Sequence, residues 1–155
     1  FLFKEKEGER KLNIKAVKDA KINVAYYRKL KQGFNVFNEE EILIKNETVT
    51  QAAKRPLSYA FCSDTAYNER IVPLIMDVDV LYHESTFLEK LAHLARKTKH
   101  STAREAANIA KQAKAKTLIL GHFSTRYEDT NDFKIEASEI FNNVKLAQEG
   151  KVFEF

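Results

Sequence analysis

The alternation of short apolar runs with helical segments is the feature that most constrains the fold of this chain. From Pro56 onward, three runs have the character of buried strands: residues 59–62, 78–82 and 117–120. Segments with helical spacing or composition separate and follow them: residues 68–76, 87–97, 102–115 and 132–147. Thr102 and Glu105 have the spacing of a capping box, and a last short strand is expected at residues 151–155. The pattern predicts an α/β fold for residues 56–155.

Polar residues interrupt the apolar sequence where these elements end. Asp64 and His122 each follow a predicted strand, Glu84 follows another, and His100 precedes a predicted helix. Ligands of α/β proteins bind outside the carboxyl ends of strands, so Asp and His side chains gathered there favour metal-assisted chemistry over core packing. Each residue taken alone also has a structural explanation as a turn, helix-cap or surface-loop residue.

The first third of the chain has a different character. Residues 10–31 contain eight basic residues and a single acid, Asp19. Residues 13–32 have helical character with a break near residues 21–23, and Gly33 ends the stretch. Clustered cations are typical of a surface that binds a polyanion, although solvated helix faces have the same composition. We therefore treat residues 1–55 as a basic, arm-like segment with flanking strands.

Composition sets the remaining bounds. The 155 residues are 44% hydrophobic and 31% charged, which predicts a soluble globular domain with a real core. No apolar run is long enough to cross a membrane. Cys62 is the only cysteine, so no internal disulfide forms, and a reducing compartment is expected. The chain opens at Phe1 without a methionine, which suggests a piece of a longer protein.

Four short motifs occur in a specific order, each at the end of an element: Ser63-Asp64-Thr65, His83-Glu84-x-Thr86-Phe87, His100-Ser101-Thr102-Ala103 and Gly121-His122-Phe123-Ser124-x-Arg126-Tyr127. In this order the motifs closely resemble the carboxyl-terminal half of ribonuclease Z, the tRNA 3′-processing endonuclease of the metallo-β-lactamase fold. The resemblance is strongest over residues 59–127 and weak before Arg55. It implies half of a four-layer αββα sandwich, with a basic arm inserted.

The resemblance also implies roles for individual residues. Asp64 would bridge two zinc ions, and His122 would be a ligand to one of them. His100 would protonate the leaving ribose oxygen, with Glu84 orienting it. A further set would contact phosphate groups or surround the RNA 3′ end: Arg104, Arg126, Ser101 and Thr102. Cations of the arm, including Lys15, Lys18 and Arg28, would hold the tRNA backbone.

General chemistry agrees with these roles. Hydrolysis of a phosphodiester needs an activated hydroxide, neutralisation of charge on the phosphoryl oxygens, and a proton for the leaving group. A carboxylate has two oxygens and can bridge two metal ions, whereas an imidazole normally binds one. The planar fork of arginine donates two hydrogen bonds to phosphate at once.

The chain departs from the family pattern in two respects. The first metal motif, His-x-His-x-Asp-His, is absent, and so is a further ligand histidine expected before the arm. Asp64 and His122 are only two ligands, whereas a catalytic zinc typically has three and a water. We therefore expect that this polypeptide by itself neither binds two zinc ions tightly nor turns over RNA. The arm also lacks the Gly-Pro-rich tip of many family members.

The sequence thus predicts the carboxyl-terminal part of a zinc-dependent endoribonuclease that removes the 3′ trailer of precursor tRNA. A cytoplasmic homodimer without membrane attachment is expected from the same resemblance. Two alternatives stay open: another phosphodiesterase of the metallo-β-lactamase fold, and a non-catalytic RNA-binding or dimerisation module. An upstream His-x-His-x-Asp-His motif in frame would favour an enzyme over a module.

Overall fold

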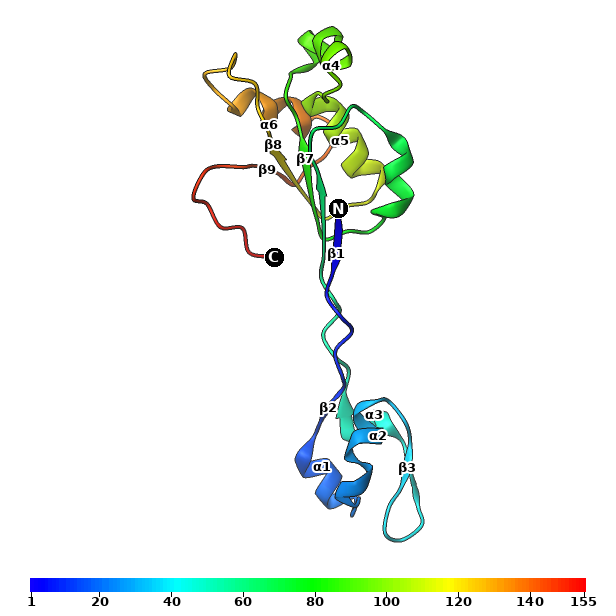
Figure 1. Cartoon of the computed structure of the whole chain (residues 1–155). Helices are drawn as coiled ribbons and strands as arrows, with labels where there is room; N and C mark the ends of the chain where they lie inside the picture. Colours follow the sequence, from blue (N-terminus) through cyan, green and yellow to red (C-terminus); the bar gives the residue numbers. More distant parts are fainter. The chain divides into compact units, whose positions relative to one another are not determined.

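The computed structural model describes all 155 residues and divides them into two compact units (Figure 1). The first unit contains Phe1–Lys4 and Leu57–Phe155, and the second contains Glu5–Pro56. The second unit is therefore an insertion in the chain of the first. The sequence division at residue 55 lies close to this boundary, but residues 1–4 belong to the first unit.

A five-stranded sheet organises the first unit. Its order is β1 (Leu2–Lys4), β6 (Ser58–Cys62), β7 (Val80–Glu84), β8 (Thr117–Gly121) and β9 (Val144–Leu146). β1 pairs antiparallel with β6, and all other neighbours are parallel. The parallel pairs place the carboxyl ends of β6, β7 and β8 side by side at one edge of the sheet, as expected for an α/β fold.

Strand β7 lies two residues further along the chain than predicted. The prediction ended it at Tyr82, because polar residues follow. In the structure His83 pairs with Cys62 and Leu120, and Glu84 pairs with Gly121, so both belong to the strand. The side chains of His83 and Glu84 are fully buried. Buried polar residues at a strand end are a feature that hydrophobic periodicity misses.

Helices α5 (Ala103–Gln112) and α6 (Asn131–Ser138) pack against one face of the sheet, and η2 (Glu69–Leu74) packs on α5. The first unit also contains η3 (Glu89–Leu91) and α4 (Ala92–Thr98). The core contains Leu81, Leu118 and Leu120 of the sheet together with the alanines of α5 and Phe133 of α6. Small alanine side chains let α5 lie close to the strands. The predicted capping box at Thr102 and Glu105 is present.

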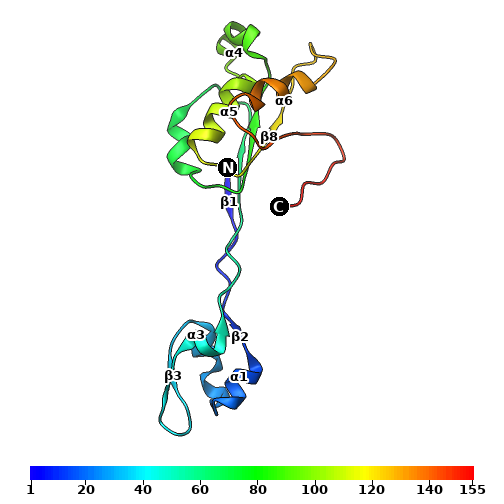
Figure 2. The same cartoon turned by 180° about the vertical axis from the view of Figure 1, so that it is seen from behind.

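The opposite face of the sheet carries aromatic side chains. Phe61 and Tyr82 stack with ring centroids 4.7 Å apart, and Phe3 stacks on Tyr59 at 6.0 Å. Tyr59, Phe61 and Tyr82 are only half-buried. Figure 2 shows the same unit from behind.

Several predicted element bounds are wrong. The last helix, predicted at 132–147, ends at Ser138, because Val144–Leu146 pairs with β8 as an edge strand. Residues 151–155, predicted as a strand, pair with no neighbour. Phe87 and Leu88, predicted as helical, are extended, and Phe87 forms a parallel bridge with Thr102. The helix predicted at 68–76 is a 3₁₀ helix containing Pro73. The helix predicted to end at 115 ends at Gln112.

The second unit has its own small core. Its elements are β2 (Lys11–Leu12), α1 (Ile14–Asp19), η1 (Val24–Tyr26), α2 (Tyr27–Lys31), β3 (Val36–Phe37), β4 (Leu43–Ile44), α3 (Asn46–Val49) and β5 (Thr50–Gln51). Val17, Ile22, Leu30, Val36 and Val49 are buried together. The predicted helix break falls at residues 20–23, and Gly33 has a left-handed φ of 91°. No helix of either unit combines the length and the hydrophobicity that a membrane span requires.

Candidate functional site

The carboxyl ends of three neighbouring strands build the candidate site. Asp64 lies just after β6, Glu84 ends β7, and His122 follows β8. Asp64 and His122 have φ angles of 50° and 59°. This left-handed conformation is uncommon for residues other than glycine, although Asp and His are among the types enriched in it. The sharp backbone turn after each strand brings the two side chains to the same place.

Three candidate metal ligands meet there. The Nε2 atom of His122 lies 3.3 Å from Oδ1 of Asp64. One ligand atom each from Asp64, His100 and His122 lies within 4.8 Å of the others, and the rings of the two histidines are 5.3 Å apart. A carboxylate and two imidazoles are donors that suit zinc. The sequence assigned Asp64 and His122 as ligands and placed His100 beside them in another role.

Thr86 fixes the orientation of His122, a role the sequence did not suggest. Its hydroxyl lies 3.0 Å from Nδ1 of His122 and 2.7 Å from Oε2 of Glu84. This contact occupies Nδ1, so Nε2 is the nitrogen that faces Asp64. The His-Glu-x-Thr spacing was the only sequence signal for this contact.

Glu84 is a fully buried carboxylate with complete hydrogen bonding. Oε1 accepts from the backbone N–H of Thr65 at 2.9 Å, and Oε2 accepts from the N–H groups of Thr86 and Ser101, each at 3.1 Å. Nδ1 of His100 lies 2.7 Å from Oε1. Burial alone would raise the pKa of Glu84, but hydrogen bonds from Thr86, His100 and Ser101 outweigh it and lower the pKa. The carboxylate therefore stays charged and holds His100 through Nδ1.

His83 supports the same segment from within the core. Its Nδ1 lies 2.7 Å from the backbone oxygen of Glu84, and its Nε2 has no hydrogen-bond partner. Burial lowers the pKa of His83, so the ring is neutral and Nδ1–H is the donor to the Glu84 carbonyl.

Ser101 and Thr102 are fully buried. The Ser101 hydroxyl donates to the backbone oxygen of Thr65 at 2.7 Å, which ties the loop before α5 to the loop after β6. The Thr102 hydroxyl caps α5 and contacts Glu89. In this structure the hydroxyl groups of both side chains form hydrogen bonds within the protein. Their predicted contact with RNA stays a prediction.

The two arginines predicted to hold phosphate lie outside the three-residue cluster. Arg104, in the first turn of α5, forms an ion pair with Glu139. Arg126 is exposed, and its guanidinium lies 3.3 Å from the Ser124 hydroxyl.

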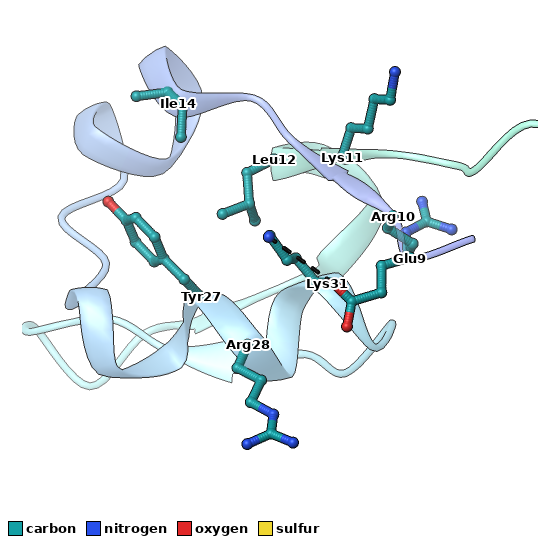
Figure 3. Close-up of a pocket in the computed structure, with 8 residues that line it drawn as sticks. All are labelled: Glu9, Arg10, Lys11, Leu12, Ile14, Tyr27, Arg28 and Lys31. Atoms are coloured by element: carbon teal, nitrogen blue, oxygen red, sulfur yellow. Dashed lines mark ion pairs between the residues drawn. The ribbon is translucent and has the colours of Figure 1, made fainter.

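The basic residues of the second unit are largely exposed. Lys15 and Lys18 lie on α1, and Arg28 lies on α2. A hollow on this unit is lined by Glu9, Arg10, Lys11, Leu12, Ile14, Tyr27, Arg28 and Lys31 (Figure 3). Within it, Arg10 donates to the Thr50 hydroxyl at 2.8 Å, and Lys31 lies 3.9 Å from the carboxylate of Glu9. Lys11 and Arg28 extend away from that ion pair.

Comparison with known proteins shows which sequences this chain resembles. No protein-family model matches the chain. The chain is 47% identical over 156 residues to ribonuclease Z of Cytophaga hutchinsonii, covering 99% of this chain and 49% of that protein. It is 42% identical to ribonuclease Z of Parabacteroides distasonis, covering 97% of this chain and 49% of the relative. The chain is a homologue of ribonuclease Z. It spans about half the length of the ribonuclease Z proteins that it matches.

Solved structures show the same fold. A metallo-β-lactamase fold protein of Bacillus subtilis matches with a TM-score of 0.59 and 27% identity, over 68% of this chain and 45% of that one. The short form of human tRNase Z matches with a TM-score of 0.51 and 28% identity, over 63% of this chain and 33% of that one. This ribonuclease Z homologue therefore has part of the metallo-β-lactamase fold, as the sequence predicted.

Proposed function

We propose that the protein containing this chain is a zinc-dependent endoribonuclease that cleaves precursor tRNA after the discriminator base and releases the 3′ trailer. The observation that carries the proposal is the meeting of Asp64, His100 and His122 within 4.8 Å at the strand ends of a ribonuclease Z homologue. We also propose that the enzyme acts in the cytoplasm, where it would encounter precursor tRNA.

The donor set fits zinc. Asp64 and His122 would supply oxygen and nitrogen ligands, and the rest of the coordination shell would come from outside this chain. Bound zinc would supply a nucleophilic hydroxide at neutral pH and would neutralise charge on the phosphoryl oxygens.

His100 is the proposed general acid. Its Nδ1 is held by the charged carboxylate of Glu84, which leaves Nε2 free to give a proton to the leaving ribose oxygen. Glu84 itself is fully buried, so it acts through His100 and does not touch the substrate.

The second unit is the proposed tRNA-holding arm. Lys15, Lys18 and Arg28 are cations for which the structure shows no ion pair, so they are available to phosphates of the tRNA backbone. Such contacts position an RNA without reading its sequence. We further propose a homodimer, which sedimentation of the purified protein at several concentrations would test.

The metal site is tested by Asp64→Ala in the longest natural polypeptide that contains this sequence. We expect zinc content to fall and cleavage of a trailer-bearing precursor tRNA to be lost. Glu149→Ala, which removes an exposed carboxylate, is the matched control and should behave as wild type. Full zinc content with an unchanged cleavage rate in Asp64→Ala would refute the proposal.

A further inference from the structure

The hydroxyl group of Tyr82 forms no hydrogen bond within the chain. Tyr82 lies on β7, two residues before Glu84, and its ring stacks on Phe61 on the aromatic face of the sheet. Tyr82 is half-buried, and its hydroxyl, which has no partner within the chain, is accessible to solvent. A tyrosine with a packed ring and an accessible O–H can donate a hydrogen bond to a partner from outside the chain.

The position of the hydroxyl is fixed by Gly121. A Cβ atom placed on Gly121 would lie 2.3 Å from Oη of Tyr82 and 2.7 Å from its Cζ. The end of the ring therefore rests on the backbone of the residue that precedes His122. The absence of a side chain at position 121 is what allows Tyr82 to reach the carboxyl end of the sheet.

The electrostatic surroundings connect this hydroxyl to the candidate site. Burial raises the pKa of Tyr82, and the carboxylates of Glu84 and Asp64 raise it further. Tyr82 therefore keeps its proton and acts as a neutral donor close to both acids. Tyr59, on the same face in β6, also has a raised pKa, but burial, Tyr82 and Cys62 are the causes and neither site acid contributes.

We propose that Tyr82 is a further substrate-contacting residue, whose hydroxyl donates a hydrogen bond to a phosphoryl oxygen held beside Asp64 and His122. The proposal rests on the proposed phosphodiesterase function. A phosphoryl oxygen is the partner that the geometry favours, because it is an acceptor and would be held at the same strand ends. A neutral donor suits this place, since it adds a hydrogen bond to the anion without forming an ion pair with Asp64.

The test is Tyr82→Phe in the zinc-loaded, longest natural polypeptide, with inorganic phosphate as the probe. The change removes only the hydroxyl and keeps the stack on Phe61. A hydrogen bond to a charged group contributes about 1.5–3 kcal/mol, so the dissociation constant of phosphate, measured by calorimetry, should rise about 10- to 100-fold. Zinc content and melting temperature should match wild type.

Tyr59→Phe is the matched control, because it removes a hydroxyl from the same face of the neighbouring strand. It should bind phosphate as wild type does. Unchanged phosphate binding in Tyr82→Phe, an equal loss in both variants, or a loss of zinc would each overturn the inference. Failure of the wild-type protein to cut precursor tRNA would count against the proposed function, while the phosphate measurement would still decide the role of Tyr82.

Discussion

At the residue scale, Glu84 connects the loops of the candidate site: it accepts hydrogen bonds from the backbone N–H groups of Thr65, Thr86 and Ser101, and it contacts Nδ1 of His100. Asp64, His100 and His122 were predicted to gather because each lies at the end of an element, and the structure brings them within 4.8 Å. The hydrogen bonds around Glu84 could not be read in advance. They depend on backbone N–H groups of three separate loops, and a sequence pattern does not show how such loops face one another.

The role of His100 can be separated from that of a metal ligand. His100→Ala should slow cleavage of precursor tRNA by about 10²- to 10⁴-fold, the contribution typical of a general acid. Zinc content should stay at the wild-type value, because His100 is proposed to give a proton and not to bind the metal. Measurement of both the zinc content and the cleavage rate of this variant distinguishes a general acid from a metal ligand. A fall in zinc content would make His100 the third ligand that its closeness to Asp64 and His122 also permits.

The charge of Glu84 should matter to stability as well. Its pKa is lower in the folded state than in the unfolded chain, so the unfolded state binds the proton more readily. The stabilisation is fully present above about pH 4.3, the ordinary pKa of a glutamate, and is lost as the pH falls through the lower folded value. Glu84→Gln should therefore lower the melting temperature at pH 7, and the difference from wild type should shrink as the pH falls below about 4.3.

Thermal unfolding between pH 7 and pH 3 would measure this difference. Glu128→Gln removes an exposed charge and is the control; it should follow the wild-type curve throughout. If the melting temperature of Glu84→Gln were lower than that of wild type by the same amount at every pH, the shape of Glu84 and not its charge would be what stabilises the fold.

At the element scale, the sequence predicted the type of several elements of the first unit but missed β9 and most element ends. Short apolar runs identified β6 and β8, and a capping box before an alanine-rich segment identified α5; all three elements contribute side chains to one continuous core. β9 was misassigned to a helix because it is only three residues long and its strand character comes from pairing with β8. β7 was placed two residues early because its last two side chains are polar but buried.

The contact between β7 and β8 gives a prediction at this scale. Gly121→Ala places a methyl group against the Tyr82 ring, which should destabilise the fold by about 1–3 kcal/mol. In a Tyr82→Leu background the same change should cost much less, because the atoms that clash are gone. Denaturant unfolding of the four proteins gives the coupling energy. Gly8→Ala, where the added atom meets only Ala53 at 3.4 Å, is the control. A cost of Gly121→Ala that is equal in both backgrounds would contradict the contact.

At the scale of the whole molecule, we assign the proposed cleavage to the first compact unit and the proposed tRNA binding to the second. The first unit carries Asp64, His100 and His122, and the second carries the basic cluster. The charge imbalance of residues 10–31 marked the second unit in the sequence. Its own core around Val17 and Leu30 could not be inferred, because its strands contain only two residues each and leave little periodicity.

This division predicts different effects on large and small substrates. Lys15 and Lys18 are two lysines of α1, and their joint replacement by alanine should weaken binding of precursor tRNA. Each lost phosphate contact should also reduce the slope of log affinity against log salt by about 0.7–0.9, because fewer counterions are released. Arg28→Ala should add to both effects. Hydrolysis of bis(p-nitrophenyl) phosphate should not change, since it needs only the strand-end site.

Lys111 and Lys114 offer a matched control, because they have the same charge and spacing. Lys111 lies in the last turn of α5, and Lys114 lies in the turn that leads from α5 into the start of β8. That end of the helix is opposite to the carboxyl ends of the strands, where the candidate site lies. Their joint replacement by alanine should leave tRNA affinity and its salt dependence near the wild-type values. An equal loss of tRNA affinity for both lysine pairs would show that the arm contributes only general electrostatic attraction. A loss of small-substrate hydrolysis in the Lys15 and Lys18 variant would mean that the second unit supports the fold or the active site and does not hold RNA.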